Sequence, residues 1–297
     1  MSIGVVVITH CAKKHLRHCL PPFLNSPLKP RVLVVNSSSN DGTVELAKEL
    51  GAETLIIPRN EFNHGTTREK ARKYLGTDIV VMVTPDAYAK DVFALEKLIS
   101  PIVKNEASVS YARQIPHNGA NFFESYSRQF NYPEKSQIRG MDDIETHGIY
   151  TFFCSNSCAA YSQKALDEIG GFEHVLLGED TIAVSKLLAR GHKIAYVAEA
   201  VVRHSHNYTL KQEFRRNFDI GLARSGYRSL LLGSDTTRGI QYTKEMFKIL
   251  IKTNPLLLPY ACMQTFVKWL GYQIGSKSQK APLSLKKRLS SQDFYWK

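Results

Sequence analysis

The 297-residue sequence has little of what a disulfide-stabilised or membrane-spanning protein needs. Its five cysteines are too few, and odd in number, for a disulfide framework in a chain of this size, so we expect reduced thiols. No apolar run approaches the roughly 18 residues of a membrane span, because the longest candidate, residues 256–267, is interrupted by Pro259 and Gln264. No positively charged segment precedes the first apolar run, so no signal peptide is expected.

The sequence also lacks both common glycine-rich phosphate loops. No G-x-G-x-x-G follows the first predicted strand, and no G-x-x-x-x-G-K-[ST] occurs anywhere. The first absence argues against a dinucleotide-dependent oxidoreductase. A nucleotide bound by this chain therefore needs another means of neutralising its phosphates, and a metal ion held by carboxylates is the other common solution.

Excess positive charge is absent from the first two-thirds of the chain. Residues 1–202 carry 22 side chains of each sign, whereas residues 203–297 carry 17 basic and five acidic ones, which is the whole net charge of +12. A chain that binds nucleic acid through its overall charge would not leave two-thirds of its length neutral, and the basic region has no recognition motif. We therefore expect no nucleic-acid partner, and a basic nucleic-acid-binding α/β protein is the weakest alternative.

Strand and helix patterns alternate up to about residue 100. Four apolar runs predict buried strands, at residues 3–9, 32–35, 54–57 and 78–83. Helices are predicted between them, including residues 43–50 and 66–75. This alternation predicts an α/β fold with a mostly parallel central sheet and helices on both faces.

The second half of the chain follows a different pattern. A helix and two short strands are predicted at residues 177–190, 194–197 and 200–203. From residue 208 onward the chain is predicted to be mainly helical, with a break at Asn254-Pro255. These patterns divide the chain into an α/β domain, residues 1–225, and a basic amphipathic helical region, residues 226–297.

Polar side chains follow three of the predicted strands. They are Thr9-His10, Asn36-Ser37-Ser38 and Thr84-Pro85-Asp86. In an open α/β sheet, ligands bind beyond the carboxyl ends of the strands, so these residues are candidates for a binding site. Asp86 has the position of a metal ligand, although an ordinary turn aspartate after proline would give the same pattern.

Two further groups carry chemistry. Glu179-Asp180 opens a predicted helix, where acidic residues favour the positive end of the helix dipole, but its apolar flanks do not suit a solvated face. One of these carboxylates could act as a general base. Arg203-His204-Ser205-His206 ends a predicted strand, where one imidazole could bind a metal ion and the arginine could bind a phosphate.

These elements occur together in the order typical of a known family. Residues 3–225 resemble the family 2 glycosyltransferases, which have a GT-A fold, in six ordered elements: residues 5–9, 34–43, 84–87, 170–172, 179–180 and His204. Further segments resemble the bacterial rhamnosyltransferase branch of that family, at residues 62–68, 84–87, 113–116, 204–209, 270–275 and 283–289. The resemblance implies a Rossmann-like nucleotide-diphospho-sugar transferase followed by a helical region.

The resemblance implies an inverting, metal-dependent transfer of a sugar, with dTDP-L-rhamnose as the expected donor, in bacterial cell-surface polysaccharide synthesis. Asp180, beside Glu179, would be the catalytic base. Asp86 would bind a divalent cation, Mg²⁺ or Mn²⁺, on the donor diphosphate, and His204 would complete or support that metal site. The residues implied to contact the donor are Thr9, Asn36, Ser37, Ser38, Arg68, Thr84, Asp86, Arg203 and Arg216.

Some residues depart from the family pattern. Asn36 stands where an aspartate commonly contacts the nucleoside, which leaves UDP- and GDP-sugars open as donors. Thr84 replaces the first aspartate of the metal motif, Glu69 follows Arg68 where asparagine is usual, and Arg216 takes the place of a tryptophan. Because of Asn36 and Thr84, a catalytically inactive donor-binding relative is also an alternative.

The basic C-terminal region has two interpretations. Lys244, Lys248 and Lys252 form a stripe on a predicted helix with a largely apolar circumference, and residues 286–288 precede the aromatic residues 294–296. The helices could simply pack on the catalytic domain, or they could meet an anionic membrane. The resemblance favours the membrane, because bacterial relatives often act on lipid-diphosphate-linked acceptors. We therefore expect a cytoplasmic protein, peripheral on the inner face of the plasma membrane, with a saccharide or lipid-linked saccharide acceptor.

Overall fold

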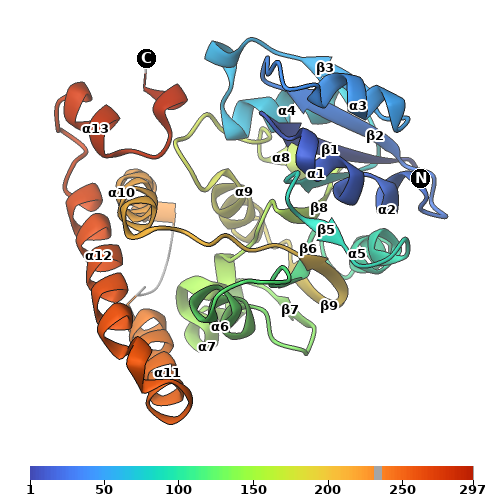
Figure 1. Ribbon diagram of the computed structural model, residues 1–297. Coiled ribbons are helices and arrows are strands. Elements are labelled where there is room, and N and C mark those ends of the chain that lie inside the picture. Colours follow the sequence, from blue (N-terminus) through green and yellow to red (C-terminus); the bar gives the residue numbers. More distant parts are fainter. Residues whose placement is uncertain (231–235, 297) are drawn as a thin grey trace.

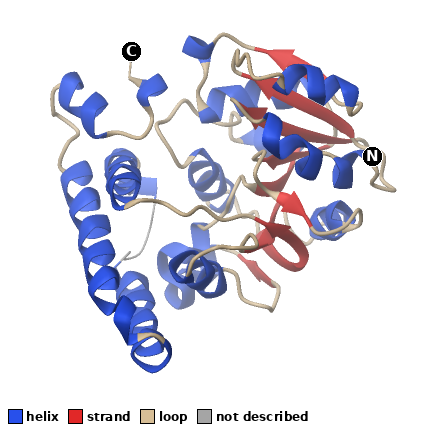
Figure 2. Cartoon of the chain, in the orientation of Figure 1, coloured by secondary structure: helices blue, strands red, loops and turns tan. Residues whose placement is uncertain are grey.

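Nine strands form one sheet in the computed structural model, which describes residues 1–230 and 236–296 (Figures 1 and 2). In spatial order the strands are β3 (Glu53–Ile56), β2 (Arg31–Asn36), β1 (Ile3–Thr9), β4 (Ile79–Val83), β8 (Cys158–Ser162), β6 (Val109–Ile115), β9 (Ile194–Arg203) and β5 (Tyr88–Ala89). The short strand β7 (Gln137–Arg139) also pairs with β9.

The strands β3, β2, β1 and β4 are all parallel. They are the parallel sheet that the alternating pattern predicts, and they confirm the α/β fold. Antiparallel pairing begins at β8, which lies between β4 and β6. Because β1, β2 and β4 run in the same direction, the polar residues that follow them meet at one edge of the sheet.

Helices cover both faces of the sheet, as predicted (Figure 2). Side chains alternate along β1, so Val5 and Val7 join the core on one face while Val6 and Ile8 join the core on the other. The first face is covered by α1 (Lys13–Cys19), α2 (Pro21–Leu24), α3 (Thr43–Glu49) and α5 (Ala94–Val103). The second is covered by α4 (His64–Leu75), α8 (Gln163–Glu168) and α9 (Glu179–Leu188).

The prediction of two short strands at residues 194–197 and 200–203 is wrong, because both belong to the single strand β9. The register of β9 with β6 shifts between Ala112 and Arg113, so the chain bulges there instead of ending the strand. The hydroxyl of Ser136 accepts the Ala198 N–H at 2.7 Å and satisfies the backbone at the bulge. Two helices, α6 (Phe122–Asn131) and α7 (Ile144–His147), precede β8.

From residue 208 the described chain is mainly helical, as predicted, with α10 (Leu210–Gly226), α11 (Thr236–Thr253), α12 (Leu258–Ser276) and α13 (Leu283–Leu289). The predicted break at Asn254-Pro255 separates α11 from α12. Helix α12 packs along α10 (Figure 1), and Gly221, Gly271 and Gly275 allow the contact, because a Cβ on any of them would overlap a backbone carbonyl of the other helix. The division at residue 225 falls at the end of α10 and stays a prediction.

The C-terminal aromatic residues pack on the α/β domain. The ring of Phe294 lies 5.0 Å from that of Phe62, and Trp296 packs against a cluster formed by Leu176 and Phe218. The Lys286 ammonium lies 5.8 Å from the centre of the Trp296 ring. The aromatic residues are thus packed against other parts of the chain, as the packing interpretation of this segment expects. Within residues 1–230 and 236–296, no helix is both long enough and apolar enough to cross a membrane.

Candidate active site

The carboxyl ends of β1 and β2 bring four of the predicted donor-contacting residues together. Thr9 and Asn36 are register partners, and the Asn36 amide donates to the Thr9 hydroxyl at 3.2 Å and to the Ser39 hydroxyl at 2.9 Å. Its carbonyl oxygen accepts the Ser39 N–H at 2.8 Å. Asn36 is buried and saturated by these bonds, so it fixes the shape of the loop at this edge.

Ser37 and Ser38 continue this loop. The Ser37 hydroxyl donates to the Thr9 carbonyl at 3.3 Å and accepts from Arg59 at 3.2 Å. Ser38 has φ of +51° and donates to the Ile57 carbonyl at 2.8 Å. Arg59, which the sequence did not single out, brings a positive charge to the loop, and its guanidinium lies 4.6 Å from the centre of the Phe294 ring.

The two predicted acids stand at the start of α9. Gly178, with φ of +86°, precedes them, and a side chain there would meet the hydroxyl of Tyr227. Glu179 forms an ion pair with Arg68 at 2.7 Å and accepts from the Asn156 amide at 3.0 Å. Burial opposes the ionisation of Glu179, but Arg68, His64 and the hydrogen bond from Asn156 together outweigh it and hold the pKa of Glu179 below its ordinary value. In this structure Arg68 is therefore engaged with Glu179, and its predicted contact with the donor stays a prediction.

Unlike Glu179, Asp180 forms no ion pair among the described residues. It accepts the N–H groups of Thr181 at 2.7 Å and Asn156 at 3.2 Å. Burial, together with the negative charge of Glu179, raises the pKa of Asp180 to about 6. A carboxylate with a pKa close to the working pH is suited to accept a proton from a substrate hydroxyl.

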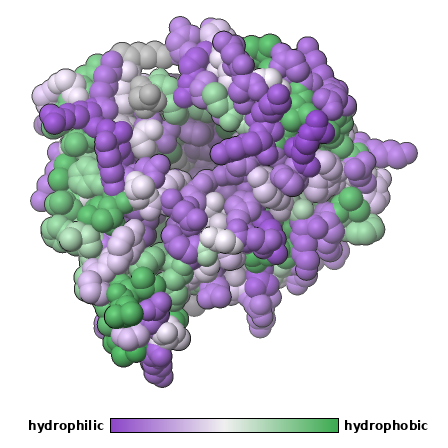
Figure 3. Space-filling view, viewed as in Figure 1, coloured by the Kyte–Doolittle hydropathy of each residue, from purple (hydrophilic) through white to green (hydrophobic). Residues whose placement is uncertain are grey.

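Asp180 faces a cavity of ≈ 470 Å³ between the sheet and α10. This central cavity is also lined by His204 and His206, which follow β9, and by Arg216 of α10. The face seen in Figure 3 is hollowed between the α/β domain and the C-terminal helices. The cavity therefore unites the predicted base with residues predicted to bind the metal and the diphosphate.

Asp86 lies within ion-pair distance of both histidines. Its Oδ2 is 3.5 Å from Nε2 of His204 and 3.3 Å from Nε2 of His206, and the two Nε2 atoms are 3.1 Å apart. Three ligand atoms that converge in this way could hold a metal ion. The sequence predicted Asp86 and His204 as metal ligands but assigned no metal to His206. The i, i+2 spacing of His204 and His206 places both on one face of an extended segment.

Neighbouring residues orient the His204 ring toward Asp86. Nδ1 of His204 donates to the Gln114 carbonyl oxygen at 2.9 Å, and the amide of Gln114 donates to Ser155 at 2.9 Å. The proton of a neutral His204 is therefore on Nδ1, which leaves the Nε2 lone pair facing Asp86. Burial lowers the pKa of both histidines, that of His206 to about 4, so both rings are neutral near pH 7.

The remaining predicted residues are placed differently. Arg216 lines the central cavity, with its guanidinium 5.5 Å from the centre of the Tyr208 ring. Arg203 instead donates to the Pro116 carbonyl at 2.9 Å, and it is not among the described residues that line this cavity. Thr84 precedes Asp86 in the turn after β4, where its carbonyl accepts the Ala87 N–H at 3.0 Å.

Similarities to known proteins agree with this fold and site. Over 94% of the chain, the structure is similar to a mannosyltransferase, PcManGT from Pyrobaculum calidifontis, solved with GDP-Man and Mn²⁺ (TM-score 0.66, 12% identity, 87% of that chain). It is also similar to residues 1–349 of TarS from S. aureus (TM-score 0.57, 14% identity, 91% of that chain). The fold is thus that of the GT-A glycosyltransferases.

Sequence relatives narrow the class. Residues 4–170 match the sequence profile of glycosyl transferase family 2. The chain is 37% identical over its whole length to the O-antigen chain rhamnosyltransferase RfbN of Salmonella typhimurium, covering 96% of that protein. It is 38% identical over 94% of its length to the O-antigen chain rhamnosyltransferase WbaN of Salmonella anatum, covering 89% of that protein. The chain belongs to glycosyl transferase family 2 and is a glycosyltransferase, as its motifs predicted.

Proposed function

We propose that this glycosyltransferase moves L-rhamnose from dTDP-L-rhamnose to a hydroxyl of a saccharide acceptor in the synthesis of a bacterial surface polysaccharide. The names of the two full-length relatives support the sugar and the process. The observation that carries the reaction type is Asp180, a half-buried carboxylate with a raised pKa in the same cavity as two histidines beside Asp86.

The proposed step is a single displacement. Asp180 accepts the proton of the acceptor hydroxyl while that oxygen forms a bond to the anomeric carbon of the sugar. The bond from the anomeric carbon to the diphosphate oxygen breaks on the opposite face, and its electrons leave with the nucleoside diphosphate. One displacement inverts the configuration and needs no second carboxylate as nucleophile. Arg216, across the cavity, provides positive charge for the departing diphosphate.

We propose that Asp86, His204 and His206 hold a divalent cation. One carboxylate oxygen and two imidazole nitrogens within 3.5 Å of one another fit Mn²⁺. The cation supplies electrophilic stabilisation of the leaving diphosphate when bound. His206 thereby replaces the ligand that is lost where Thr84 stands in place of an acid, and this argues for an active enzyme over a catalytically inactive relative.

We also propose that α11 and α12 rest on an anionic lipid surface at the cytoplasmic face of the membrane. Large apolar side chains are exposed on these helices and the turn between them, with Ile251 62%, Leu256 89%, Phe266 53% and Trp269 56% exposed. Lys248 and Lys252 are exposed on the same helix as Ile251. Apolar surface gathers over this part of the molecule, at the lower left of Figure 3. Exposed apolar and basic side chains together favour an anionic membrane.

A thermal-shift panel tests the donor. The unaltered protein is heated with dTDP, UDP or GDP, each with and without Mn²⁺. We expect dTDP with Mn²⁺ to raise the melting temperature most, since a ligand that binds only the folded state stabilises it. A larger rise in melting temperature with UDP or GDP would indicate the same reaction with a UDP- or GDP-sugar as the donor. No rise with any nucleotide diphosphate would contradict the proposal.

A further inference from the structure

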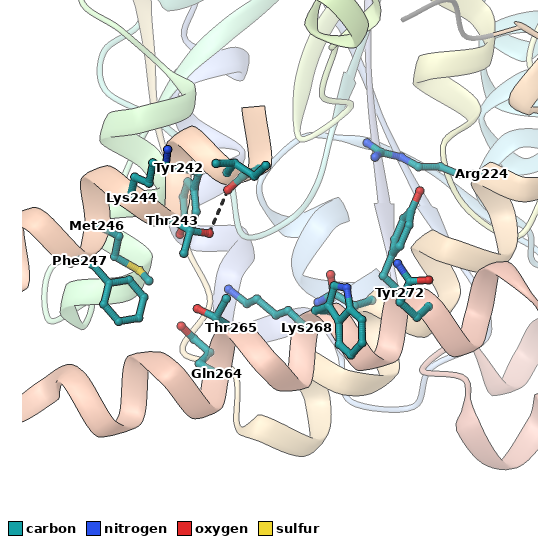
Figure 4. A pocket seen from close by; sticks show the side chains of 15 residues that line it. Arg224, Tyr242, Thr243, Lys244, Met246, Phe247, Gln264, Thr265, Lys268 and Tyr272 are labelled. Atoms are coloured by element: carbon teal, nitrogen blue, oxygen red, sulfur yellow. Dashed lines mark hydrogen bonds between the residues drawn. The ribbon is translucent and has the colours of Figure 1, made fainter. Parts of the chain in front are cut away.

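A second cavity adjoins the central cavity on the side of the C-terminal helices. This helical groove has a volume of ≈ 740 Å³ and lies between α10, α11 and α12 (Figure 4). Its apolar walls include Met246, Phe247 and Trp269. Asn217, Tyr242 and Lys268 line both the helical groove and the central cavity, so the two spaces meet at these side chains.

All the charged side chains among the described lining residues of the helical groove are basic. Arg224, Lys244 and Lys268 line it, and none of its described lining residues is acidic. Lys268 stands at the junction of the two cavities, because its Nζ lies 3.0 Å from Oε1 of Glu213, which lines the central cavity. The ion pair with Glu213 offsets the charge of Lys268, whereas Arg224 and Lys244 add positive charge to the apolar walls, so the groove favours a ligand that is both apolar and anionic.

The outer end of the groove is continuous with the exposed apolar surface. Trp269 lines the groove and is 56% exposed, and its ring lies 6.0 Å from that of the exposed Phe266. Ile240, on the opposite wall, is 49% exposed. A long apolar chain that extends out of the groove would thus contact the exposed apolar side chains of Trp269, Phe266 and Ile240.

We propose that the helical groove binds the lipid diphosphate of the acceptor, a sugar joined through a diphosphate to an apolar chain. The apolar chain lies along Phe247 and Trp269, and the diphosphate lies between Lys244 and Lys268. The sugar then passes Lys268 into the central cavity, where its hydroxyl meets Asp180. This inference rests on the proposed glycosyl transfer and assigns the part of the chain that recognises the acceptor.

Farnesyl diphosphate, in monomeric form and without divalent cations, is a suitable probe. The chain has two tryptophans, so in the Trp296→Phe variant Trp269 alone reports on the groove by fluorescence. We expect a saturable change in Trp269 emission, and an affinity for farnesyl diphosphate at least about tenfold above that for inorganic diphosphate or farnesol. Calorimetric titration of the unaltered chain gives the same comparison without any substitution.

Residues one helical turn apart provide matched controls. Lys244 and Phe247 line the groove, whereas Lys248 and Ile251 are exposed on α11 and do not line it. We expect Lys244→Gln and Phe247→Asn each to weaken binding of farnesyl diphosphate about fivefold or more, while Lys248→Gln and Ile251→Asn leave it unchanged. Equal binding by all four variants, or equal loss in all four, would overturn the proposal.

The same variants separate this inference from the proposed function. Each is also heated with dTDP and Mn²⁺, which reports on the donor site only. A normal response to the nucleotide without binding of farnesyl diphosphate would reject the acceptor groove and leave the transferase intact. If the unaltered chain gave no response to dTDP, the proposed donor would fail independently of the groove.

Discussion

Arg68 and Glu179 form an ion pair of 2.7 Å beside the proposed base, and the exposed fraction of each side chain is under a tenth. Residues 111 positions apart are thereby joined, since Arg68 lies in α4 and Glu179 begins α9. Burial disfavours the ionised form of Glu179, and the positive charge of Arg68 counters that effect. The pair thus sets the negative charge that acts on the pKa of Asp180.

Breaking this ion pair should destabilise the protein strongly. Arg68→Met leaves the Glu179 carboxylate buried without a cation, which typically destabilises a protein by about 3–5 kcal/mol. The double variant Arg68→Met, Glu179→Gln should be more stable than Arg68→Met alone, because no unpaired charge remains. Urea denaturation of the single and double variants measures the difference, and a double variant no more stable than Arg68→Met would contradict the argument. Arg17→Met, at an exposed ion pair with Glu49, is the control and should change stability by less than about 1 kcal/mol.

Asp180→Asn should abolish transfer without loss of donor binding. The amide cannot accept the proton of the acceptor hydroxyl, whereas the fold and the nucleotide site remain. In the unaltered enzyme, transfer should fall as the pH drops below about 6, since Asp180 then becomes protonated. Initial rates from pH 5 to 9, with dTDP binding measured on the variant, test both statements. Near-normal turnover by Asp180→Asn would remove Asp180 from the reaction.

The same substitution should stabilise the fold. The pKa of Asp180 is raised in the folded state from an ordinary value of 3.8, so above pH 6 the folded protein buries a charge that the unfolded chain solvates. Below about pH 4 the carboxyl group is protonated in both states and this penalty is absent. Asp180→Asn should therefore raise the melting temperature at pH 8, and the gain should shrink as the pH falls through 6. An equal rise in melting temperature at pH 8 and at pH 4 would point to a cause other than the ionisation of Asp180.

The fold and the residue types of the site were predictable from the sequence for a local reason. Unbroken apolar runs such as residues 3–9 are what strands covered on both faces require, and Asp86 follows such a run directly. The position of Glu179 and Asp180 at the start of a predicted helix with apolar flanks also identified them as candidates from the sequence. The two parts of β9 were predicted separately because a bulge interrupts the pattern without ending the hydrogen-bonded ladder.

Long-range partners were not predictable in this way. The Arg68–Glu179 pair, the bond between Gln114 and His204, and the contact of Phe294 with Phe62 all join distant segments. Nothing in the local pattern of Arg68 distinguishes an arginine that binds a diphosphate from one that neutralises a buried acid. The role of the glycines of α10 and α12 was likewise not predictable, because it depends on the close approach of the other helix.

Those glycines lead to a test of how the helical region is attached. Gly275→Ala places a methyl group against the Phe218 carbonyl, so it should force α12 away from α10 and destabilise the protein by about 1–3 kcal/mol. Gly239→Ala, in α11, meets no atom within 4 Å and should be neutral or slightly stabilising. Thermal unfolding of both variants makes the comparison. Equal stability would show that the close contact of these helices contributes nothing.

The two histidines beside Asp86 lead to a prediction on metal preference. Imidazole nitrogens bind Mn²⁺ better than Mg²⁺, which prefers oxygen ligands. The unaltered protein should therefore bind Mn²⁺ more tightly than Mg²⁺, and His206→Ala should weaken Mn²⁺ binding about tenfold or more. Thr84→Asp, which adds an oxygen ligand beside Asp86, should narrow the preference by strengthening Mg²⁺ binding.

Electron paramagnetic resonance of free Mn²⁺, with Mg²⁺ as competitor, measures these affinities without any turnover. His192→Ala is the matched control, because His192 pairs with Glu168 in a different part of the molecule. Its Mn²⁺ affinity should equal that of the unaltered protein. If His206→Ala bound Mn²⁺ as tightly as this control, Asp86 and His204 would hold the ion alone, and the loss of the acid at Thr84 would stand uncompensated.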